Sequence, residues 1–301
     1  MESVNPPKVA RGLAAPAVKL DEAGLIAEDL PCRHCGYNLR TLSPAVQCPE
    51  CGTSVGRSVH GDYLRYADPA WVRGLAIGAT LVFVATTLQT VYWAVVVGLT
   101  LKGYLVPGWY WMSTLVTSAI VGVGSWLITV PDPGSGGLDA RDRTRRRARF
   151  FLVIGFALMT SSQFLGGLAT GLWHALEIFA HLNLIAGVIA LLSCVKELLL
   201  RIPDRVLARS LSRFTWFFVA SLILNTTMGL ARIVVAGNTS PAANIVPLAV
   251  CFSGFASIVA MIWAIRVSFR LRLAFNEAAL LTQATSDAHK SPQLDTKGGA
   301  P

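Results

Sequence analysis

Apolar residues dominate the chain from Leu75 to Phe269, and short polar stretches interrupt them at intervals. Six apolar runs result, each about 20 residues or slightly longer, the length that a helix needs to cross a hydrocarbon core of about 30 Å. Gly and Pro punctuate the breaks, as at Pro107 and Gly108. The pattern predicts an all-α membrane protein with six transmembrane helices. The predicted spans are 75–97, 109–130, 150–172, 176–199, 214–236 and 245–267.

Polar segments flank this apolar zone and differ in character. The first residues lack a periodic pattern, and from about residue 286 the chain is rich in Pro, Gly, Lys and Ser, so we expect disorder at both ends. The predicted segments are a disordered tail (1–30), a cysteine module (31–56), a linker (57–74), the six-helix transmembrane domain (75–272) and a cytoplasmic tail (273–301).

Composition supports a lipid environment. Of the 301 residues, 53% are hydrophobic and 14% are charged, whereas about a quarter of a soluble domain is charged. A large soluble helical protein would need a more charged surface, so we expect the lipid bilayer to be the main solvent. The net charge of +9 could suggest a nucleic-acid partner, but the arginines form short clusters between apolar runs, where membrane topology places them.

The cationic residues predict the orientation of the spans. They are concentrated in alternate segments, whereas the other three loops contain only Lys102, and cation-rich segments stay inside. Both termini are therefore expected in the cytoplasm, with Trp71 and Trp216 as anchors at the inner interface. The cations of the inner segments are Arg57, Arg65, Arg73, Arg141, Arg143, Arg145, Arg146, Arg147, Arg149, Lys196, Arg201, Arg205, Arg209, Arg213, Arg266, Arg270 and Arg272.

A Pro-Asp pair follows the second and the fourth run, at Pro131-Asp132 and at Pro203-Asp204. Proline disfavours a helical conformation in the residue before it, so each pair marks a helix stop. The aspartate suits the cap of the next helix. The same helix-stop signal could have arisen independently at the two positions, which explains the pairs about as well as a duplication of helical hairpins would.

Four cysteines form two matched motifs, Cys32-Arg33-His34-Cys35-Gly36 and Cys48-Pro49-Glu50-Cys51-Gly52, separated by twelve residues. A Cys-x-x-Cys pair followed by Gly builds a tight knuckle in which both thiolates point at one ion, and Gly permits the turn. Two knuckles supply a closed tetrahedral site. The spacing predicts a four-cysteine zinc ribbon, with zinc binding supplying the folding energy of a module that has little core. The predicted ligands are Cys32, Cys35, Cys48 and Cys51.

Three other interpretations of the cysteines fit less well. A rubredoxin-type iron site usually has a longer insert, disulfides are disfavoured in a reducing compartment, and a thioredoxin-like role needs one pair rather than two. His34 is expected to face solvent rather than to act as a fifth ligand. The charges around the motif are too balanced for a nucleic-acid track, so a protein partner is favoured. These charges are Arg33, Arg40 and Arg57 against Asp29 and Glu50.

The ribbon segment resembles a known group. Tyr37-Asn38-Leu39-Arg40 after the first knuckle, and Thr53 after the second, are similar to the amino-terminal ribbon of uncharacterised multi-pass membrane proteins abundant in planctomycete bacteria. The similarity covers about residues 31–58, and the Pro-Asp turns also look similar. The resemblance implies a bacterial cytoplasmic (inner) membrane location and the same architecture. It implies no catalytic activity.

Polar residues inside two spans are candidates for an intramembrane site. His174, Glu177 and His181 stand on one face of a helix, where they could bind a metal or relay protons. Arg232 lies near the outer end of the fifth span, at about the depth of Glu177. The two could form an ion pair, or each could reach headgroup water alone. Alternatively, these polar residues lie at hydrated helix ends near the membrane interface and form no functional site.

Other features of the spans predict packing. The amides Gln89, Gln163, Asn183 and Asn225 are expected to make hydrogen bonds between helices. Two Gly-x-x-x-Gly motifs permit close backbone approach, within the chain or in a homo-oligomer. They are Gly74-x-x-x-Gly78 and Gly167-x-x-x-Gly171.

The sequence contains no Ser-His-Asp set, phosphate-binding glycine loop or paired intramembrane carboxylates. We therefore interpret the protein as a non-enzymatic, membrane-anchored zinc-ribbon protein that mediates protein contacts or assembly at the cytoplasmic face. The alternative is a small transporter or an intramembrane enzyme that uses the polar residues of spans four and five.

Overall fold

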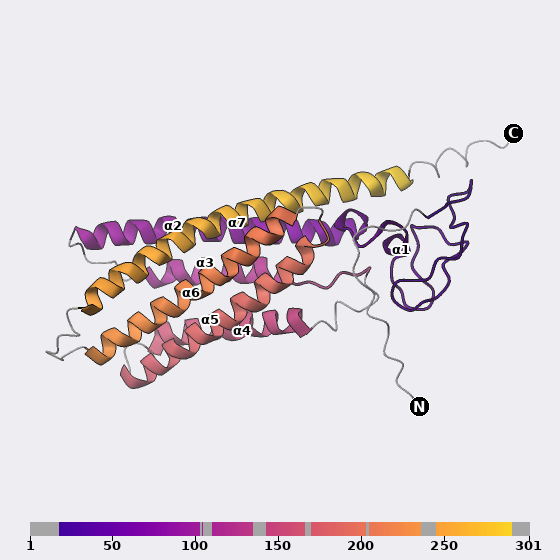
Figure 1. Cartoon of the computed structure of the whole chain (residues 1–301). Coiled ribbons are helices and arrows are strands. Elements are labelled where there is room, and N and C mark those ends of the chain that lie inside the picture. The colour runs from indigo at the N-terminus through magenta and orange to yellow at the C-terminus, as the bar shows by residue number, and fades with distance from the viewer. Residues whose placement is uncertain are drawn as a thin grey trace, which may run out of the picture.

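The computed structural model describes residues 18–102, 104, 110–134, 143–165, 170–202, 205–235 and 245–290. Regular structure in these residues is helical, with three isolated β-bridges in the amino-terminal module. The helices, shown in Figure 1, are α1 (Gly56–His60), the 3-10 turn η1 (Leu64–Tyr66), α2 (Pro69–Leu101), α3 (Tyr110–Ile128), α4 (Arg143–Leu165), α5 (Thr170–Leu199), α6 (Arg205–Val235) and α7 (Ile245–Lys290).

Local chemistry explains where α2 begins and where α3 ends. The Asp68 carboxylate accepts a hydrogen bond of 2.8 Å from the backbone N–H of Trp71, and so satisfies an amide that a helix start leaves without a partner. Pro69 takes the first helical position, where its missing N–H costs nothing. Helix α3 ends at Ile128, shortly before Pro131. The predicted stop at this proline is therefore confirmed.

The six long helices of the described residues form one bundle. Each packs against the next along the chain, and α7 returns to pack against α2 (Figure 1). The cysteine module lies at the same end of the bundle as the carboxyl-terminal part of α7. Successive helices run in opposite directions, so the starts of α2, α4 and α6 also lie at this end.

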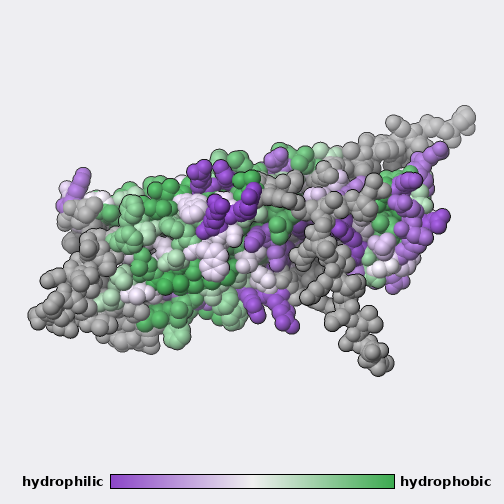
Figure 2. All heavy atoms as spheres, viewed as in Figure 1, coloured by the Kyte–Doolittle hydropathy of each residue, from purple (hydrophilic) through white to green (hydrophobic). Residues whose placement is uncertain are grey.

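Four helices contain a described segment long and apolar enough to cross a membrane, and α3 adds a shorter apolar segment. Their surface agrees with a lipid environment, because Val95, Phe179 and Phe255 are each more than half exposed. Figure 2 shows apolar side chains over much of the visible face of the bundle and polar ones toward the cysteine module. The candidate spans are Pro69–Leu99, Ile178–Leu199, Val206–Met228 and Phe252–Ala284, and the shorter segment is Met112–Ile128.

The main buried core lies at the end of the bundle next to the cysteine module. It combines Leu75 from the start of α2, Leu198 from the end of α5, Leu211 from the start of α6 and Phe275 from the second half of α7, all fully buried. Trp71 also belongs to this core at 7% exposure, so it packs inside the protein, whereas Trp216 is 69% exposed and its anchor role stays a prediction.

The ordered module begins before the predicted boundary at residue 31. Ile26 is buried, its N–H donates to the Leu42 carbonyl at 3.1 Å, and its carbonyl accepts from the Thr41 N–H at 2.9 Å. Together with Leu30, Ile26 packs in the core of the module. Residues 18–30 therefore belong to the module rather than to the predicted disordered tail (1–30), because apolar packing orders them. Residues 1–17 lie outside the described residues.

Two further segments have more structure than the sequence predicts. The linker at 57–74 contains α1, η1 and the start of α2. Helix α7 continues to Lys290 through the predicted tail. The two meet where the Thr282 hydroxyl donates to the Leu64 carbonyl at 3.1 Å. Burial of Leu64 and Phe275 explains the order, since tertiary packing outweighs local polar composition.

Close packing between spans follows several of the predicted motifs. A Cβ atom at Gly78 would lie 2.7 Å from the Gly124 carbonyl oxygen, so α2 and α3 are in backbone contact there. The predicted amide contacts are confirmed at two positions. Gln89 accepts a hydrogen bond from Thr117 on α3, and Asn183 on α5 donates to the Phe151 carbonyl of α4 at 2.9 Å. Asn225 is exposed, and the side chain of Gln163 and the whole of Gly167 lie outside the described residues.

Candidate metal centre and the charged network beneath it

The two cysteine motifs fold into the same backbone turn. In each, the glycine N–H donates to the first cysteine carbonyl at 2.9 Å, from Gly36 to Cys32 and from Gly52 to Cys48. The glycine φ angles are +78° and +69°, in the left-handed region that favours glycine. Both predicted knuckles are therefore confirmed, and their repeated geometry directs the cysteines toward a common point.

The four sulfurs form one compact cluster. All four lie within 4.8 Å of one another, and the Sγ–Sγ distances from Cys32 to Cys51 and from Cys35 to Cys48 are both 3.7 Å. These distances exceed the S–S bond of about 2.05 Å, so the cysteines are free thiols. A tetrahedral thiolate site with metal–sulfur bonds of about 2.3 Å places its sulfurs about 3.8 Å apart. The cluster therefore fits a metal ion.

The pKa values of the neighbouring thiols shift in different directions. The Tyr37 N–H favours ionisation of Cys35, but desolvation and the three neighbouring thiols raise its pKa to about 12. Burial opposes ionisation of Cys51, but hydrogen bonding with Thr53, Cys35 and His34 lowers its pKa to about 6. Burial also raises the pKa of Cys32. A bound divalent ion would favour the thiolate form of its cysteine ligands.

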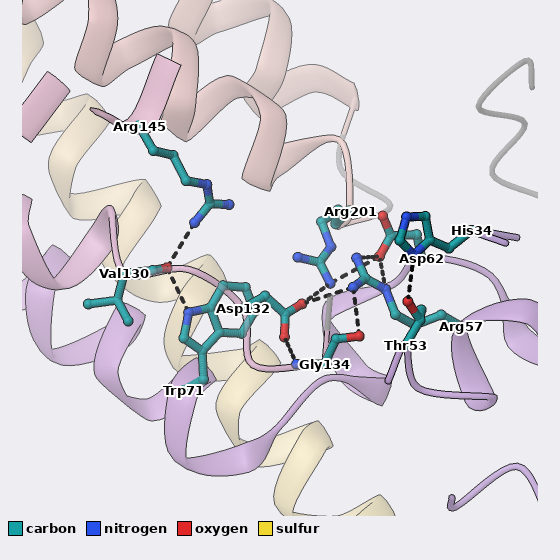
Figure 3. A network of polar contacts seen from close by, with 10 residues as sticks. All are labelled: His34, Thr53, Arg57, Asp62, Trp71, Val130, Asp132, Gly134, Arg145 and Arg201. Atoms are coloured by element: carbon teal, nitrogen blue, oxygen red, sulfur yellow. Dashed lines mark hydrogen bonds and ion pairs between the residues drawn. The ribbon is translucent and has the colours of Figure 1, made fainter. Parts of the chain in front are cut away.

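His34 stands beside the cluster and outside its ligand set. It is exposed, as predicted, and its Nδ1 lies 3.4 Å from the Thr53 hydroxyl oxygen. The same oxygen lies 3.4 Å from Cys51 Sγ, and Figure 3 shows the contact between His34 and Thr53. Thr53 is itself buried, so it links the histidine to the cysteine through one fixed hydroxyl group. His34 therefore contacts the cysteine cluster through Thr53.

A charged network joins the module to the ends of the long helices. Asp132, from the segment after α3, has a side chain that is 1% exposed. Its Oδ2 accepts from the Arg201 guanidinium at 2.7 Å and lies 3.5 Å from Nη1 of Arg57 (Figure 3). Arg57 belongs to α1 and Arg201 follows α5, so one carboxylate unites three parts of the chain that are distant in sequence.

Asp62 completes the network. It lies 2.6 Å from Arg57 and 3.0 Å from Arg201, so two carboxylates and two guanidinium groups alternate and their charges balance. Burial opposes ionisation of Asp62, but Arg201 and Arg57 outweigh it and lower its pKa from 3.8. Because the folded pKa lies below the unfolded value, this pairing stabilises the protein at neutral pH. The stabilisation is lost only as the pH falls through the folded pKa.

Backbone contacts reinforce the attachment of the module. The Ser54 N–H and the Arg57 guanidinium both donate to the Gly134 carbonyl, at 3.1 Å each, and the Gly134 N–H donates to Asp132 at 2.9 Å. Ser54 follows the second knuckle by two residues. The segment after α3 therefore connects the cysteine module to the bundle directly.

The carbonyl of Val130 anchors a second group of side chains. It accepts from the indole N–H of Trp71 at 3.0 Å and from Arg145 at 2.8 Å (Figure 3). The chain leaves the helix here because of Pro131, so this carbonyl has no helical partner. Trp71 also lies under the Arg201 guanidinium, whose central carbon is 5.2 Å from the ring centroid.

Sequence reasoning did not identify this network. Asp132 was expected to cap a helix, and it does accept the Gly134 N–H, but its main partners are two arginines. The available signal was the scarcity of acidic residues beside many arginines, since the chain has 17 Asp and Glu against 26 Lys and Arg. Asp62 and Asp132 are acidic residues inside the arginine-rich segments, which makes them natural partners.

The intramembrane candidates are placed only in part. His174 and Glu177 lie in α5 and Arg232 lies in α6, two helices that pack together, but their side chains are outside the described residues. His181 is half-buried in α5. The predicted pairing of Glu177 with Arg232 therefore stays a prediction.

The fold and the cluster define a class: an all-helical protein, in its described residues, with four candidate membrane spans and a cluster of four cysteines that could hold a metal ion. Comparisons with protein-family models, with curated proteins and with solved structures each find no match. The function is therefore inferred from the residues and their geometry.

Proposed function

We propose that this chain is a six-span protein of the bacterial cytoplasmic membrane whose amino-terminal zinc ribbon is a protein-contact module at the cytoplasmic face. The six apolar runs and the alternating arginine clusters support the span number and the cytoplasmic position of both termini. The resemblance of residues 31–58 to planctomycete ribbon proteins supports the bacterial assignment.

Zinc is the metal that the ligand set favours. Four cysteines in two closely spaced pairs are a common structural zinc set. A cytoplasmic position also favours a bound metal over disulfides. Four protein ligands complete a tetrahedral shell and leave no open position for a substrate, so the ribbon is proposed as a structural and non-enzymatic unit.

The observation that carries the proposal is the one-sided attachment of the ribbon. Arg57 and Ser54 join it to Gly134 and Asp132 at the helix ends. Its remaining surface exposes large apolar side chains, which we propose as contact residues for the partner. These are Leu20, Tyr37 and Val46, each between 41% and 44% exposed.

Site-specific crosslinking in intact membranes tests this function. Tyr37 or Val46 is replaced with photoreactive p-benzoylphenylalanine, and Arg143, which is exposed at the start of α4, serves as the matched control position. We expect a discrete protein adduct from the two ribbon positions and none from the control. The adduct should vanish in a Cys48→Ser background, and mass spectrometry then identifies the partner, including a second copy of this chain.

Two results would reject the contact function. One is the absence of any adduct at both ribbon positions while the zinc content of the protein is normal. The other is an adduct that forms equally from position 143 or survives loss of Cys48, because neither would depend on the folded ribbon.

A further inference from the structure

A groove of about 420 Å³ lies between α2 and α7. The two helices run side by side along the bundle (Figure 1). Every lining residue falls within Pro69–Leu99 or Phe252–Ala284, two of the segments that are long and apolar enough to cross a membrane. The lining comprises Arg73, Ala76, Ile77, Thr80, Leu81, Asn276, Ala279, Leu280 and Gln283.

The wall of the groove is mostly apolar. Small residues, Ala76 and Ala279, leave room between the helices, while Ile77 is 49% and Leu280 is 73% exposed. Exposing such side chains to water costs about 25 cal/mol per Å² of apolar surface, whereas a hydrocarbon chain would cover them without that cost. The volume suits part of a chain-like apolar ligand, since ligand sites commonly span about 300–1,000 Å³.

A single cation stands at one end of the groove. Arg73 lies in the second turn of α2, about 6 Å along the helix from the start of the candidate span at Pro69. Its Nη2 donates to the Gln283 side-chain oxygen at 3.0 Å, which orients the guanidinium across the mouth of the groove. In the described part of the chain, Arg73 has no carboxylate within ion-pair distance, and no lining residue is acidic.

We propose that this groove binds one anionic glycerophospholipid, with an acyl chain between α2 and α7 and the headgroup phosphate on Arg73. An apolar wall that ends in a guanidinium at a span terminus matches the two halves of a phospholipid. Phosphate accepts paired hydrogen bonds from a guanidinium. The absence of an acidic residue from the lining leaves no partner for the ammonium group of a zwitterionic lipid, which favours the anionic class. The site is separate from the metal cluster and does not depend on the proposed contact function.

Native mass spectrometry of the detergent-purified full chain tests the proposal. Phosphatidylglycerol and phosphatidylcholine with identical acyl chains are the probes, and inorganic phosphate is a third arm that separates lipid from free anion. We expect one phosphatidylglycerol per chain, bound on the order of tenfold more tightly than to Arg73→Gln. Arg73→Lys should keep most of the preference. Ala279→Phe, which fills the groove and keeps the cation, should lose both lipids.

Arg270→Gln is the matched control, because Arg270 is an exposed arginine of α7 outside the groove. Its lipid binding should equal that of the parent chain. The proposal is overturned if Arg73→Gln binds as the parent does, if Arg270→Gln loses as much, if the two lipids bind equally, or if inorganic phosphate displaces the lipid. Should Arg73→Gln fail to fold, as judged by thermal unfolding in detergent, the Arg73→Lys and Ala279→Phe variants decide the same question.

Discussion

Asp132 forms ion pairs with two arginines at one end of the helix bundle. Its carboxylate is buried between Arg57 and Arg201, so it neutralises two cations that would otherwise face each other in a poorly hydrated space. A buried ion pair is costly to desolvate, and its net contribution to stability can be small. Removing one member is different, because it leaves a buried charge without its partner.

A double-mutant cycle measures this dependence. Asp132→Asn alone should lower the free energy of unfolding by about 3–5 kcal/mol, because Arg57 and Arg201 keep only Asp62 as a carboxylate partner. Asp132→Asn combined with Arg201→Gln should cost less than the sum of the two single changes. Thermal unfolding in detergent supplies the measurement. Additivity within about 0.3–0.5 kcal/mol would show that the two side chains do not interact.

The cysteines permit an equally direct test at single positions. The purified protein should contain about one zinc per chain, and Cys35→Ser or Cys48→Ser should remove it and make the ribbon protease-sensitive. Cys194→Ser is the matched control, since Cys194 is a buried cysteine of α5 outside the cluster. Elemental analysis gives the metal content. Iron with visible absorbance in place of zinc would contradict the assignment.

Among the elements, α2 contacts two neighbouring helices of the bundle. It is capped by Asp68, touches the backbone of α3 at Gly78, and packs along α7. Helix α7 in turn continues past the last predicted span because Phe275 and Thr282 are buried against the start of the bundle. The sequence pattern placed the end of this span near residue 267. Composition does not predict which polar segments other parts of the chain will bury.

The Gly74-x-x-x-Gly78 motif contains its own control. A Cβ at Gly78 would meet the Gly124 carbonyl oxygen at 2.7 Å and side chains of Leu127 and Ile128 at 3.0 Å, whereas nothing lies within 4 Å of one at Gly74. Gly78→Ala should therefore destabilise the protein by about 1–3 kcal/mol through overpacking. Gly74→Ala should be neutral or slightly stabilising. Thermal unfolding of both variants compares them, and equal effects would refute the close approach of α2 and α3.

At the scale of the whole molecule, the fully packed core and the charged network lie at the same end of the bundle. The cysteine module is attached there, so its fold and the helix packing are structurally connected through Arg57 and Asp132. Loss of the ribbon fold would remove Arg57 from the network and leave Asp132 with Arg201. Ribbon and bundle should therefore not behave as independent units.

Topology is the test that belongs to this scale. Reporter fusions at Gly136 and Ser286 should report the cytoplasm, because arginine-rich segments resist translocation, and fusions at Gly103 and Thr239 should report the outside. Gly136, Gly103 and Thr239 lie outside the described residues, so the experiment examines the sequence prediction directly. An external reporter at Gly136 would be incompatible with six spans in the proposed orientation.

Much of the architecture was predictable because it depends on short-range patterns. Apolar runs of membrane-spanning length predicted the helices, a proline predicted the end of α3, and paired cysteines with a following glycine predicted the knuckles and the cluster of four cysteines. Each signal lies within a few residues or one helix length. Backbone hydrogen bonding and hydrophobic burial act on that scale, so the sequence alone determined these elements.

Only the tertiary structure decided how the elements are joined. Arg201 and Asp132 are 69 residues apart, and Arg57 and Gly134 are 77 apart. Many arginines compete for few carboxylates in this chain, and no local pattern selects the pairs. Packing brings three helix ends together, and the cost of burying a charge then favours the pairing of Arg57 and Arg201 with aspartates. Tertiary contacts also explain three features that composition did not predict. These are the ordered structure of residues 18–30, the ordered linker and the length of α7.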